Sequence, residues 1–369
     1  MERFARMLQR GFTEKGIQTE IWRPENILGK FGKTAHAGLG KWLGYIDKWI
    51  LFPFILKWRR FRLKEKGQDI RFHVCDHSNA PYRRQLPPDK TAITCHDVLA
   101  IRGALGHADA YCPASGTGKL LQKWILGNLI KYTRIAAVSQ LTLDQLKELS
   151  NGKTRADKKD WQVIYNAFNA EFKVMDPSRA FSLLKEAGLD PAAPFMLHVG
   201  SRLPRKNRKL LLDITARAGD RWNGRICFAG QPLDDDLIGH AKDLGLWERV
   251  ISVEKPGHDV LVALYSSCFA FVFPSFSEGF GWPVIEAQAC GAPVIASSAP
   301  PMPEISGGAA LHASPHDASA FADALVSLQE PALRKTIIHS GLQNITRFDF
   351  GTIVNAYVAL HDLKPVNAL

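Results

Sequence analysis

Short apolar runs and longer amphipathic stretches alternate along the second half of the chain. The runs are rich in β-branched, aromatic and aliphatic residues and are bounded by Gly, Pro or charged residues. This pattern predicts buried strands, with helices in the intervals. Strands that alternate with helices at this distance favour parallel sheets covered on both faces. The predicted strands are Phe195–Val199, Arg225–Ala229, Val250–Val253, Ala270–Phe273 and Val294–Ser297.

The first half shows the same alternation after an opening stretch of helical spacing over residues 1–16. Two α/β halves of this kind predict two doubly wound, Rossmann-like domains that face one another across a cleft. A short helix flanked by Asp-Pro pairs indicates the boundary, so we expect domains over residues 1–170 and 171–345. In the first half, strands are predicted over 18–22, 70–75, 91–95, 134–139 and 161–165, and helices over 41–64 with a break at Pro53, over 117–131 and, capped by Ser139, over 141–149.

The beginning of the first domain departs from the usual pattern. A doubly wound domain ordinarily opens with a strand, and the loop after that strand approaches the ligand. This chain opens with a predicted helix. We expect either that the numbered start lies downstream of the true one or that the first domain lacks its first strand.

Residues 270–297 carry the most informative pattern. Pro274 ends the predicted strand, Pro283 suits the first position of a helix, and Gly291 suits the residue after its end. The loop 278–281 therefore joins the carboxyl end of a strand to the amino end of a two-turn helix. Free N–H groups and the helix dipole converge there and favour a phosphate or sugar hydroxyls.

Two carboxylates belong to this segment, Glu278 in the loop and Glu286 eight positions later on the helix. A carboxylate beside a phosphate repels it. We therefore expect both to accept hydrogen bonds from hydroxyl groups, one from a sugar and one from a ribose. The alternative is a Gly-rich turn with two surface glutamates.

Two further loops follow predicted strands. Arg205 and Lys206 come after strand 195–199, where they would neutralise a diphosphate leaving group; the alternative is a solvated basic turn. His96 and Asp97 come after strand 91–95 of the other half. A histidine facing the cleft there would contact a transferring group, whereas a lone histidine is more often structural.

These motifs together resemble glycosyltransferase family 4 (group 1), whose members have the GT-B fold. Residues 274–287 are similar to its E-x7-E signature, and the loop 200–207 is similar to a form of its second motif common among mannosyltransferase-like members. Residues 94–97 resemble its first-domain motif, and residues 163–166 resemble the usual entry to the linker. The resemblance extends from about residue 70 to residue 365.

The resemblance implies that a hexose is transferred with retention from a nucleotide-diphosphate sugar, with no obligatory metal and no other cofactor. GDP-mannose is favoured by the Pro-Arg-Lys-Asn form of the second motif. A last helix, in a segment over 346–369, would cross back onto the first domain. The implied roles are catalysis for His96, Glu278 and Lys206, diphosphate binding for Lys206 with Arg205, donor-sugar binding for Glu278, Gly279, Phe280 and Gly281, ribose binding for Glu286, and a place on the acceptor side for Asp97.

An alternative from a different class is a nucleotide-sugar-binding scaffold of the same fold that has no catalytic activity. A two-domain epimerase or another α/β enzyme of that kind is disfavoured, because the chain has no dinucleotide-binding fingerprint.

Charge is distributed unevenly between the halves. Residues 1–170 hold 29 basic and 15 acidic residues, a net +14, whereas the remainder nets −3. The densest basic run, residues 57–64, follows the apolar and aromatic residues 49–56. Two interpretations stay open: a segment that lies in the interface of an anionic membrane, or a core helix with a solvated basic end. No nucleic-acid-binding signature is visible. The basic half favours an anionic, membrane-held acceptor, and the expected acceptor is a glycan or a lipid-linked molecule in cell-surface polysaccharide assembly.

The remaining composition bears on the compartment. Six scattered cysteines have neither a C-x-x-C pair nor zinc spacing, which predicts buried, reduced thiols. No run approaches about 18 apolar residues, and the first residues lack the apolar core of a secretory signal. We therefore expect a cytoplasmic protein, peripheral at the inner face of the membrane if the interfacial interpretation holds.

Overall fold

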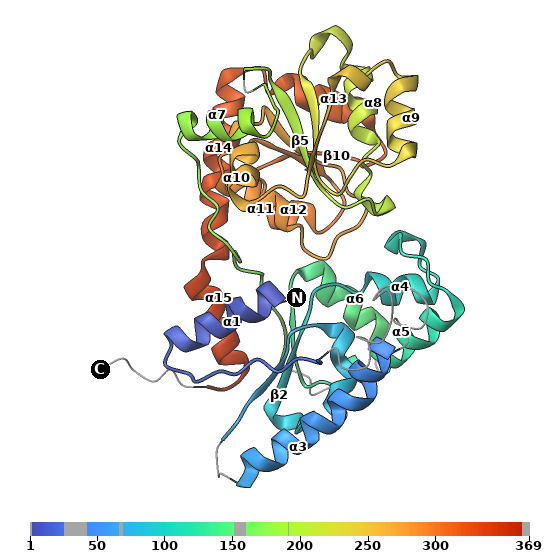
Figure 1. Cartoon of the computed structure of the whole chain (residues 1–369), viewed down its shortest axis with the longest axis vertical. Helices are drawn as coiled ribbons and strands as arrows, with labels where there is room; N and C mark the ends of the chain where they lie inside the picture. The colour runs from blue at the N-terminus through green and yellow to red at the C-terminus, as the bar shows by residue number, and fades with distance from the viewer. Residues whose placement is uncertain (1, 26–42, 66–68, 151–159, 191, 364–369) are drawn as a thin grey trace.

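The structure is a computed structural model that describes residues 2–25, 43–65, 69–150, 160–190 and 192–363. Its strands form two parallel sheets, one in each half of the chain, which confirms the expected pair of α/β domains (Figure 1). The first sheet has the order β1-β2-β3-β4. Its strands are β1 (Phe72–Val74), β2 (Thr91–Cys95), β3 (Arg134–Ala137) and β4 (Asp160–Val163).

The second sheet has the order β10-β9-β8-β5-β6-β7. The chain therefore starts at the centre of the sheet, winds outward through β6 and β7, and returns to the centre at β8 before it winds outward on the other side. Every strand pair in this sheet is parallel. The strands are β5 (Phe195–Gly200), β6 (Arg225–Gly230), β7 (Val250–Glu254), β8 (Ala270–Phe273), β9 (Val294–Ser297) and β10 (Leu311–Ala313).

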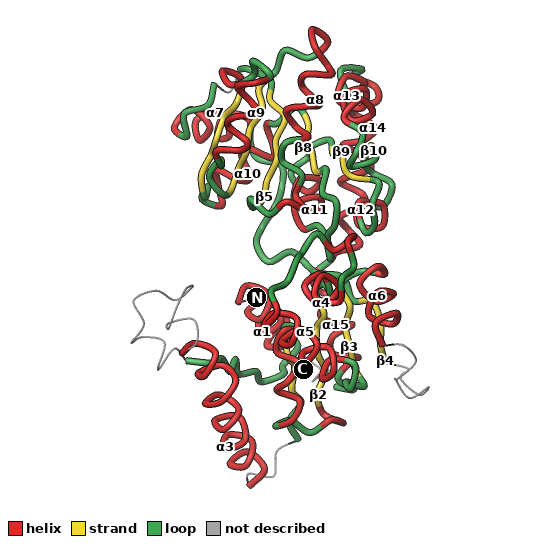
Figure 2. The backbone as a smooth tube through the Cα atoms, turned by 90° about the vertical axis from the view of Figure 1, so that its right-hand side faces the viewer, coloured by secondary structure: helices red, strands yellow, loops and turns green. Residues whose placement is uncertain are grey.

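Helices cover both sheets, and the two domains lie one above the other along the long axis of the molecule (Figure 2). The first domain has α1 (Glu2–Glu14), α3 (Phe52–Glu65), α4 (Leu99–Leu105), α5 (Gly116–Leu129) and α6 (Gln140–Ser150). The second has α7 (Pro177–Glu186), α8 (Leu210–Ala218), α9 (Asp235–Asp243), α10 (His258–Ser267), α11 (Trp282–Ala289), α12 (Met302–Ser306), α13 (Ala318–Ser327) and α14 (Pro331–Asn344), followed by α15 (Phe350–Leu360).

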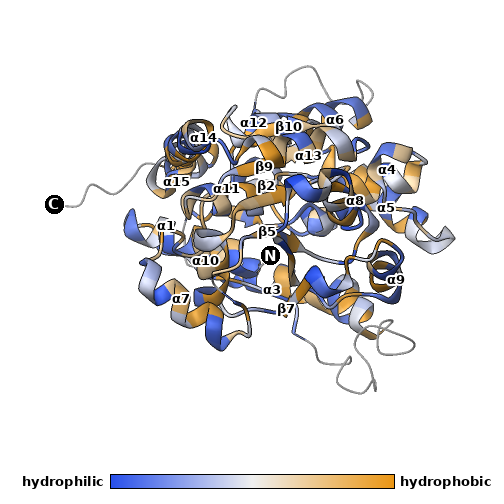
Figure 3. Ribbon diagram, turned by 90° about the horizontal axis from the view of Figure 1, so that it is seen from above, coloured by the Kyte–Doolittle hydropathy of each residue, from blue (hydrophilic) through white to orange (hydrophobic). Residues whose placement is uncertain are grey.

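Each sheet is sandwiched between two hydrophobic clusters, because its buried strands present apolar side chains to both faces. The strands are accordingly hydrophobic in Figure 3, whereas the helices around them carry hydrophilic residues outward. Within the described ranges, no helix is both long enough and apolar enough to span a bilayer.

The last helix returns to the first domain, where α15 packs against α1 (Figure 1). Their side chains, including Phe4 and Tyr357, share one cluster with the first sheet. Gly11 makes the close approach possible, since a Cβ at that position would lie 2.2 Å from a methyl group of Val354. The two ends of the described chain thus build one face of the first domain together.

Three expectations about elements need correction. The strand predicted over 18–22 is absent: this segment pairs with no strand, and the carbonyl of Thr19 instead accepts a hydrogen bond from the Gln9 side chain at 3.2 Å. Pro53 does not break the helical stretch: a π-helical turn over Asp47–Leu51 leads directly into α3 at Phe52, where the backbone is still helical, so the chain stays helical on both sides of the proline. The three-residue strand β10 was not predicted, because it is short and lacks β-branched residues.

Candidate active site

The strand order of the second sheet fixes where a ligand would bind. β5 and β8 are neighbours, but the chain leaves them toward opposite edges of the sheet. Such a switch point opens a crevice at the carboxyl ends of the two strands, and ligands of open α/β sheets bind there. The loop with Arg205 and Lys206 follows β5, and the loop with Glu278 follows β8. Two motifs 72 residues apart in the sequence therefore meet at one point.

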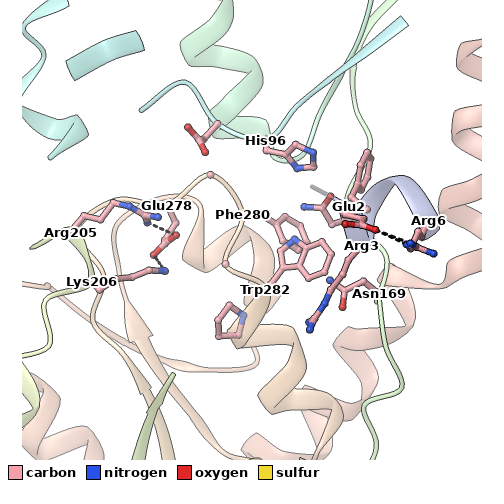
Figure 4. Close-up of a pocket in the computed structure, with 16 residues that line it drawn as sticks. Glu2, Arg3, Arg6, His96, Asn169, Arg205, Lys206, Glu278, Phe280 and Trp282 are labelled. Atoms are coloured by element: carbon pink, nitrogen blue, oxygen red, sulfur yellow. Dashed lines mark hydrogen bonds and ion pairs between the residues drawn. The ribbon is translucent and has the colours of Figure 1, made fainter. Parts of the chain in front are cut away.

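A cavity of about 820 Å³ opens at this point between the two domains (Figure 4). Its size lies within the range of about 300–1,000 Å³ that is usual for small-molecule sites. Most of the predicted residues line it, namely His96, Asp97, Arg205, Lys206, Glu278 and the loop 279–281. The cavity thus brings both halves of the predicted site together.

Arg205, Lys206 and Glu278 form a buried ion-pair cluster. The Lys206 Nζ lies 2.6 Å from Glu278 Oε1, and an Arg205 guanidinium nitrogen lies 2.7 Å from Oε2. Burial acts to raise the pKa of Glu278, but the two cations outweigh it and hold that pKa below its usual range. The cluster therefore carries a net charge of one positive unit. We expected Glu278 to face a sugar with a free carboxylate, whereas both of its oxygens contact cations in this structure.

The two glycines of the loop are needed for different physical reasons. A Cβ on Gly279 would lie 2.0 Å from the carbonyl oxygen of His96, so glycine is required where the two domains touch. The Gly279 carbonyl itself accepts hydrogen bonds from Ser139 and Thr142 of the first domain, at 2.6 and 3.2 Å. Gly281 has φ +100°, which favours glycine at the amino end of α11. The sequence predicted that these glycines let a ligand approach; Gly279 also lets the other domain approach.

Phe280, between the two glycines, is buried and lines the cavity. It packs with Phe348 in the turn between α14 and α15 and lies near Tyr165 of the segment between the domains, with ring centroids 5.7 and 6.4 Å apart. Its side chain therefore helps to join the domains, while its backbone remains in the loop.

His96 faces the cavity in a fixed orientation. Its Nε2 lies 3.0 Å from the carbonyl oxygen of Cys75, and its ring meets the edge of Phe4 from α1 at 4.7 Å. Burial lowers the pKa of His96 to about 4, with Asp76 opposing the shift. The neutral ring therefore donates from Nε2 to the carbonyl and leaves Nδ1 as an acceptor. Asp97, beside it, accepts from the Leu99 amide at 3.0 Å.

Glu286 does not line the cavity. It lies on α11 one turn beyond Trp282, and its carboxylate accepts a hydrogen bond from the Tyr265 hydroxyl at 3.1 Å. Burial raises the pKa of Glu286 to about 7, although Tyr265 and the charge of Arg3 act in the opposite direction. Of the site residues predicted, Glu286 alone lies outside the lining.

Eight lining residues were not predicted as site residues, namely Glu2, Arg3, Phe4, Arg6, Asn166, Asn169, Trp282 and Pro283. The Asn166 side chain is buried, and neither its oxygen nor its nitrogen has a hydrogen-bond partner among the described residues. Its position at the end of the motif over 163–166 was a usable signal. Arg3 gave none, because its place depends on how α1 packs.

Comparison with known proteins agrees with this geometry. Residues 182–341, nearly the whole second domain, match the family described as "Glycosyl transferases group 1". This match is confined to the second domain and covers less than half of the chain. Curated relatives that match a larger part of the chain are mannosyltransferases by name.

Two curated relatives illustrate this. O-antigen chain mannosyltransferase B of Escherichia coli is 33% identical over 177 residues, which is 45% of this chain and 46% of the relative. O-antigen chain mannosyltransferase RfbU of Salmonella typhimurium is 25% identical over 83% of this chain and 75% of the relative. The chain thus spans about half the length of the first relative and three quarters of the second.

Solved structures support the GT-B fold of this chain. HepE of Anabaena, solved with UDP and glucose, has a TM-score of 0.67 at 19% identity, over 95% of this chain and 88% of that one. Sucrose-phosphate synthase of Thermosynechococcus elongatus has a TM-score of 0.64 at 22% identity, over 84% and 77%. Within the described part of the chain, no three His, Cys, Asp or Glu side chains are grouped so that they could hold a metal ion.

Proposed function

We propose that this protein is a retaining glycosyltransferase that moves a hexose from a nucleotide-diphosphate sugar to a glycan or a lipid-linked acceptor. One observation carries the proposal: Arg205 and Lys206 lie at the switch point of the second sheet, across one cavity from His96 and Asp97 of the first domain. A donor in the crevice would have its diphosphate at the cations and its sugar toward the other domain.

The reaction would use the cations where charge develops. The bond between the sugar carbon and the diphosphate oxygen breaks, and the diphosphate keeps the electron pair. The acceptor oxygen forms the new bond to that carbon and transfers its proton to the departing diphosphate oxygen. Lys206 and Arg205, already held by Glu278, would stabilise the departing diphosphate without rearrangement. Because the cluster has a net positive charge, it attracts this anion despite the carboxylate.

His96 would act on the sugar as a hydrogen-bond acceptor. Its Nε2 is bound to the Cys75 carbonyl, which leaves Nδ1 for a hydroxyl of the transferred sugar. Glu278 would position the two cations and Glu286 would accept from the ribose hydroxyls. Gly279, Phe280 and Gly281 would contribute backbone amides. Because two protein cations already lie at the diphosphate position, we propose that no divalent metal is required, so that EDTA leaves turnover unchanged.

The preferred donor is GDP-mannose. The mannosyltransferase names of the relatives support this choice, and the O-antigen names support a polysaccharide or lipid-linked acceptor. HepE, solved with UDP and glucose, favours a uridine nucleotide instead. Calorimetric titration with GDP-mannose, UDP-glucose, ADP-glucose and dTDP-glucose separates these possibilities. If any other donor binds more tightly than GDP-mannose, the preference for GDP-mannose is wrong.

The test of the site compares Lys206 with Lys209, which lies outside the cavity and pairs with Asp236 at 2.7 Å. Removal of Lys206 alone would leave Glu278 with one partner and cost about 3–5 kcal/mol of folding stability. The pair Lys206→Met with Glu278→Gln avoids this, because it removes both charges together. We expect the pair to lose donor binding and transfer by at least about tenfold while it stays folded, and Lys209→Ala to keep both. Unchanged affinity in the paired variant would exclude the proposed diphosphate site.

A second candidate is a nucleotide-sugar-binding scaffold without catalysis. The observation that favours it is the engagement of both Glu278 oxygens by cations, which leaves no free carboxylate at the sugar. Release of nucleoside diphosphate only when an acceptor glycan is added would exclude this candidate, whereas tight donor binding without release would favour it.

A further inference from the structure

One face of α3 is unusually apolar for a surface. Of the thirteen large apolar side chains that are exposed among the described residues, four lie within residues 50–61. They are Ile50 at 51% exposure, Phe54 at 69%, Trp58 at 56% and Phe61 at 61%. Phe54, Trp58 and Phe61 are spaced by four and three positions, so they form one stripe along the helix, with Ile50 in the preceding turn. We call these four residues the α3 stripe.

The opposite face of α3 is anchored to the first domain. Phe52 and Leu56 are buried in the cluster around the first sheet, and Phe52 contacts the ring of Tyr82 with centroids 5.2 Å apart. Arg60 donates to the Gln85 carbonyl at 2.6 Å, and the Arg59 guanidinium lies over Trp22 at 5.3 Å. The α3 stripe is therefore held outward, and Figure 2 shows the helix projecting from the side of the domain.

Positive charge accompanies the stripe. Lys57 is exposed between Phe54 and Phe61 on the same face, and no ion pair of this lysine is found among the described residues. The Arg62 guanidinium lies 4.7 Å from the centre of the Trp58 ring, so this cation stands beside the stripe. Acidic side chains are absent from the stretch between Ile50 and Arg62. An anionic surface would thus meet aromatic and basic groups together.

We propose that α3 is an interfacial helix that docks the first domain onto an anionic phospholipid bilayer. Phe54, Trp58 and Phe61 would enter the headgroup and upper acyl region, which aromatic side chains favour. Lys57 and Arg62 would contact the lipid phosphates. This inference goes beyond the proposed reaction and does not depend on it, because it rests on the surface of α3 alone.

The same features argue against the other occupants. A second copy of this chain would place Lys57 and Arg62 of both copies close together, since the stripe is basic at its edges. A nucleic acid would use the cations, but the aliphatic Ile50 and the three exposed rings along a convex helix offer it no groove. The bilayer is the one partner that uses both the apolar and the basic groups.

The test is sedimentation of the full chain with vesicles of phosphatidylcholine alone or with phosphatidylglycerol added at about one third, a negative surface that attracts basic segments. One variant replaces Phe54, Trp58 and Phe61 by Ser, and its control is Phe181→Ser on α7, an exposed aromatic of the second domain. A second variant is Lys57→Glu with Arg62→Glu. Its control reverses the exposed Lys185 and Lys335 of the second domain, with the same change in net charge.

We expect the unaltered chain to sediment with the anionic vesicles, and both α3 variants to lose at least about tenfold in binding while both controls keep it. Melting temperature checks folding, because all of the changed side chains are exposed. Absence of sedimentation, or binding that survives both α3 variants, would overturn the proposal. The proposal would also be overturned if the chain formed a dimer that dissociates when the α3 stripe is replaced, or if it bound a nucleic-acid duplex and not the vesicles. No vesicle contains a sugar donor or acceptor, so none of these results depends on the proposed transferase activity.

Discussion

The two domains contribute to the same cavity in different ways. The second domain provides Arg205, Lys206 and Glu278 from loops that follow two adjacent strands, so its part of the site is fixed by one sheet. The first domain provides His96 from a strand end, Arg3 from α1 and Asn166 from the segment between the domains. Its part depends on elements that are distant in sequence and meet only after folding.

Under the proposed function, this difference would assign the donor to the second domain and the acceptor to the first. The cations and the glycine loop suit a nucleotide diphosphate and are short, local motifs. The residues across the cavity belong to no distinctive sequence motif, and only their position in the folded protein places them at the site. Variants of the second domain should therefore change donor binding, whereas variants at the contact between domains should change transfer more than donor binding.

The largest effect is expected from Gly279→Ala. The added Cβ would lie 2.0 Å from the His96 carbonyl oxygen and 2.7 Å from the Asp97 Cβ, so the domains must move apart. Because a displacement of about 1 Å can cost about 100-fold in rate, we expect transfer to fall by that much or more. Donor affinity, measured by calorimetry, should change far less.

The matched control is Gly239→Ala on α9, where an added Cβ meets no atom within 4 Å. It should keep full transfer and gain a little stability, because alanine favours a helix over glycine. Equal losses of donor affinity and transfer in Gly279→Ala would show that Gly279 serves the donor itself and not the contact between the domains.

The next effect concerns pH and Glu286. Its pKa is raised to about 7 by burial, so the carboxylate that would accept ribose hydrogen bonds is largely protonated below that pH. Donor affinity should therefore fall by about tenfold per pH unit below about 7 and level off above it. Glu286→Gln should bind weakly at every pH, and calorimetry between pH 5.5 and 8.5 checks both.

The same group affects stability with a definite sign. Its pKa is about 7 in the folded state and near the ordinary glutamate value when unfolded, so the folded state binds the proton more tightly. Folding stability should decrease as pH rises between these two values, by up to roughly 3 kcal/mol. Tyr265→Phe removes a hydrogen bond to the ionised form and should move the affinity profile toward higher pH. If neither substitution changes the pH dependence of donor affinity, Glu286 has no role in donor binding.

The sequence was most informative where function and local pattern coincide. The backbone conformation of this segment favours prolines at 274 and 283 and glycines near Glu278. The loop, the helix α11 and the place of the loop at the cavity could therefore be predicted from these residues. The five strands predicted in the second domain agree with the structure to within one residue at each end, whereas β10 was missed.

Prediction was poorer where a side chain's surroundings come from distant elements. The pairing of both Glu278 oxygens with Arg205 and Lys206 follows from the adjacency of β5 and β8, which spacing does not encode. The segment 18–22 alternates like a strand but finds no neighbouring strand with which to pair. Residues 41 and 42, at the start of the helix predicted over 41–64, lie outside the described residues.

A smaller effect is expected from Asn166→Ala. The buried amide has no partner among the described residues and lines the cavity, so a substrate hydroxyl is its natural partner. We expect transfer to fall by about tenfold, as for loss of one hydrogen bond, while folding stability is kept. Asn128→Ala is the opposite case: Asn128 is buried and donates to the Trp124 carbonyl at 2.8 Å, so it should lose stability and keep transfer. Loss of stability alone in Asn166→Ala would contradict its role.

The smallest effect tests whether α15 belongs functionally to the first domain. The Tyr357 hydroxyl lies 3.2 Å from Thr94 Oγ1, which lies 2.8 Å from His73 Nε2, and His73 Nδ1 lies 3.0 Å from His361 Nε2. Burial keeps the pKa of both histidines low, so both rings are neutral and each group can donate to the next along the chain. Tyr357→Phe removes the first donor only, since Thr94 still bonds His73. We expect a loss of about 1 kcal/mol in urea unfolding with unchanged donor affinity. Thr94→Val interrupts the chain for both neighbours and should cost more. A change of donor affinity in Tyr357→Phe would mean that α15 acts on the second domain, and the separation of the two domains' roles would then fail.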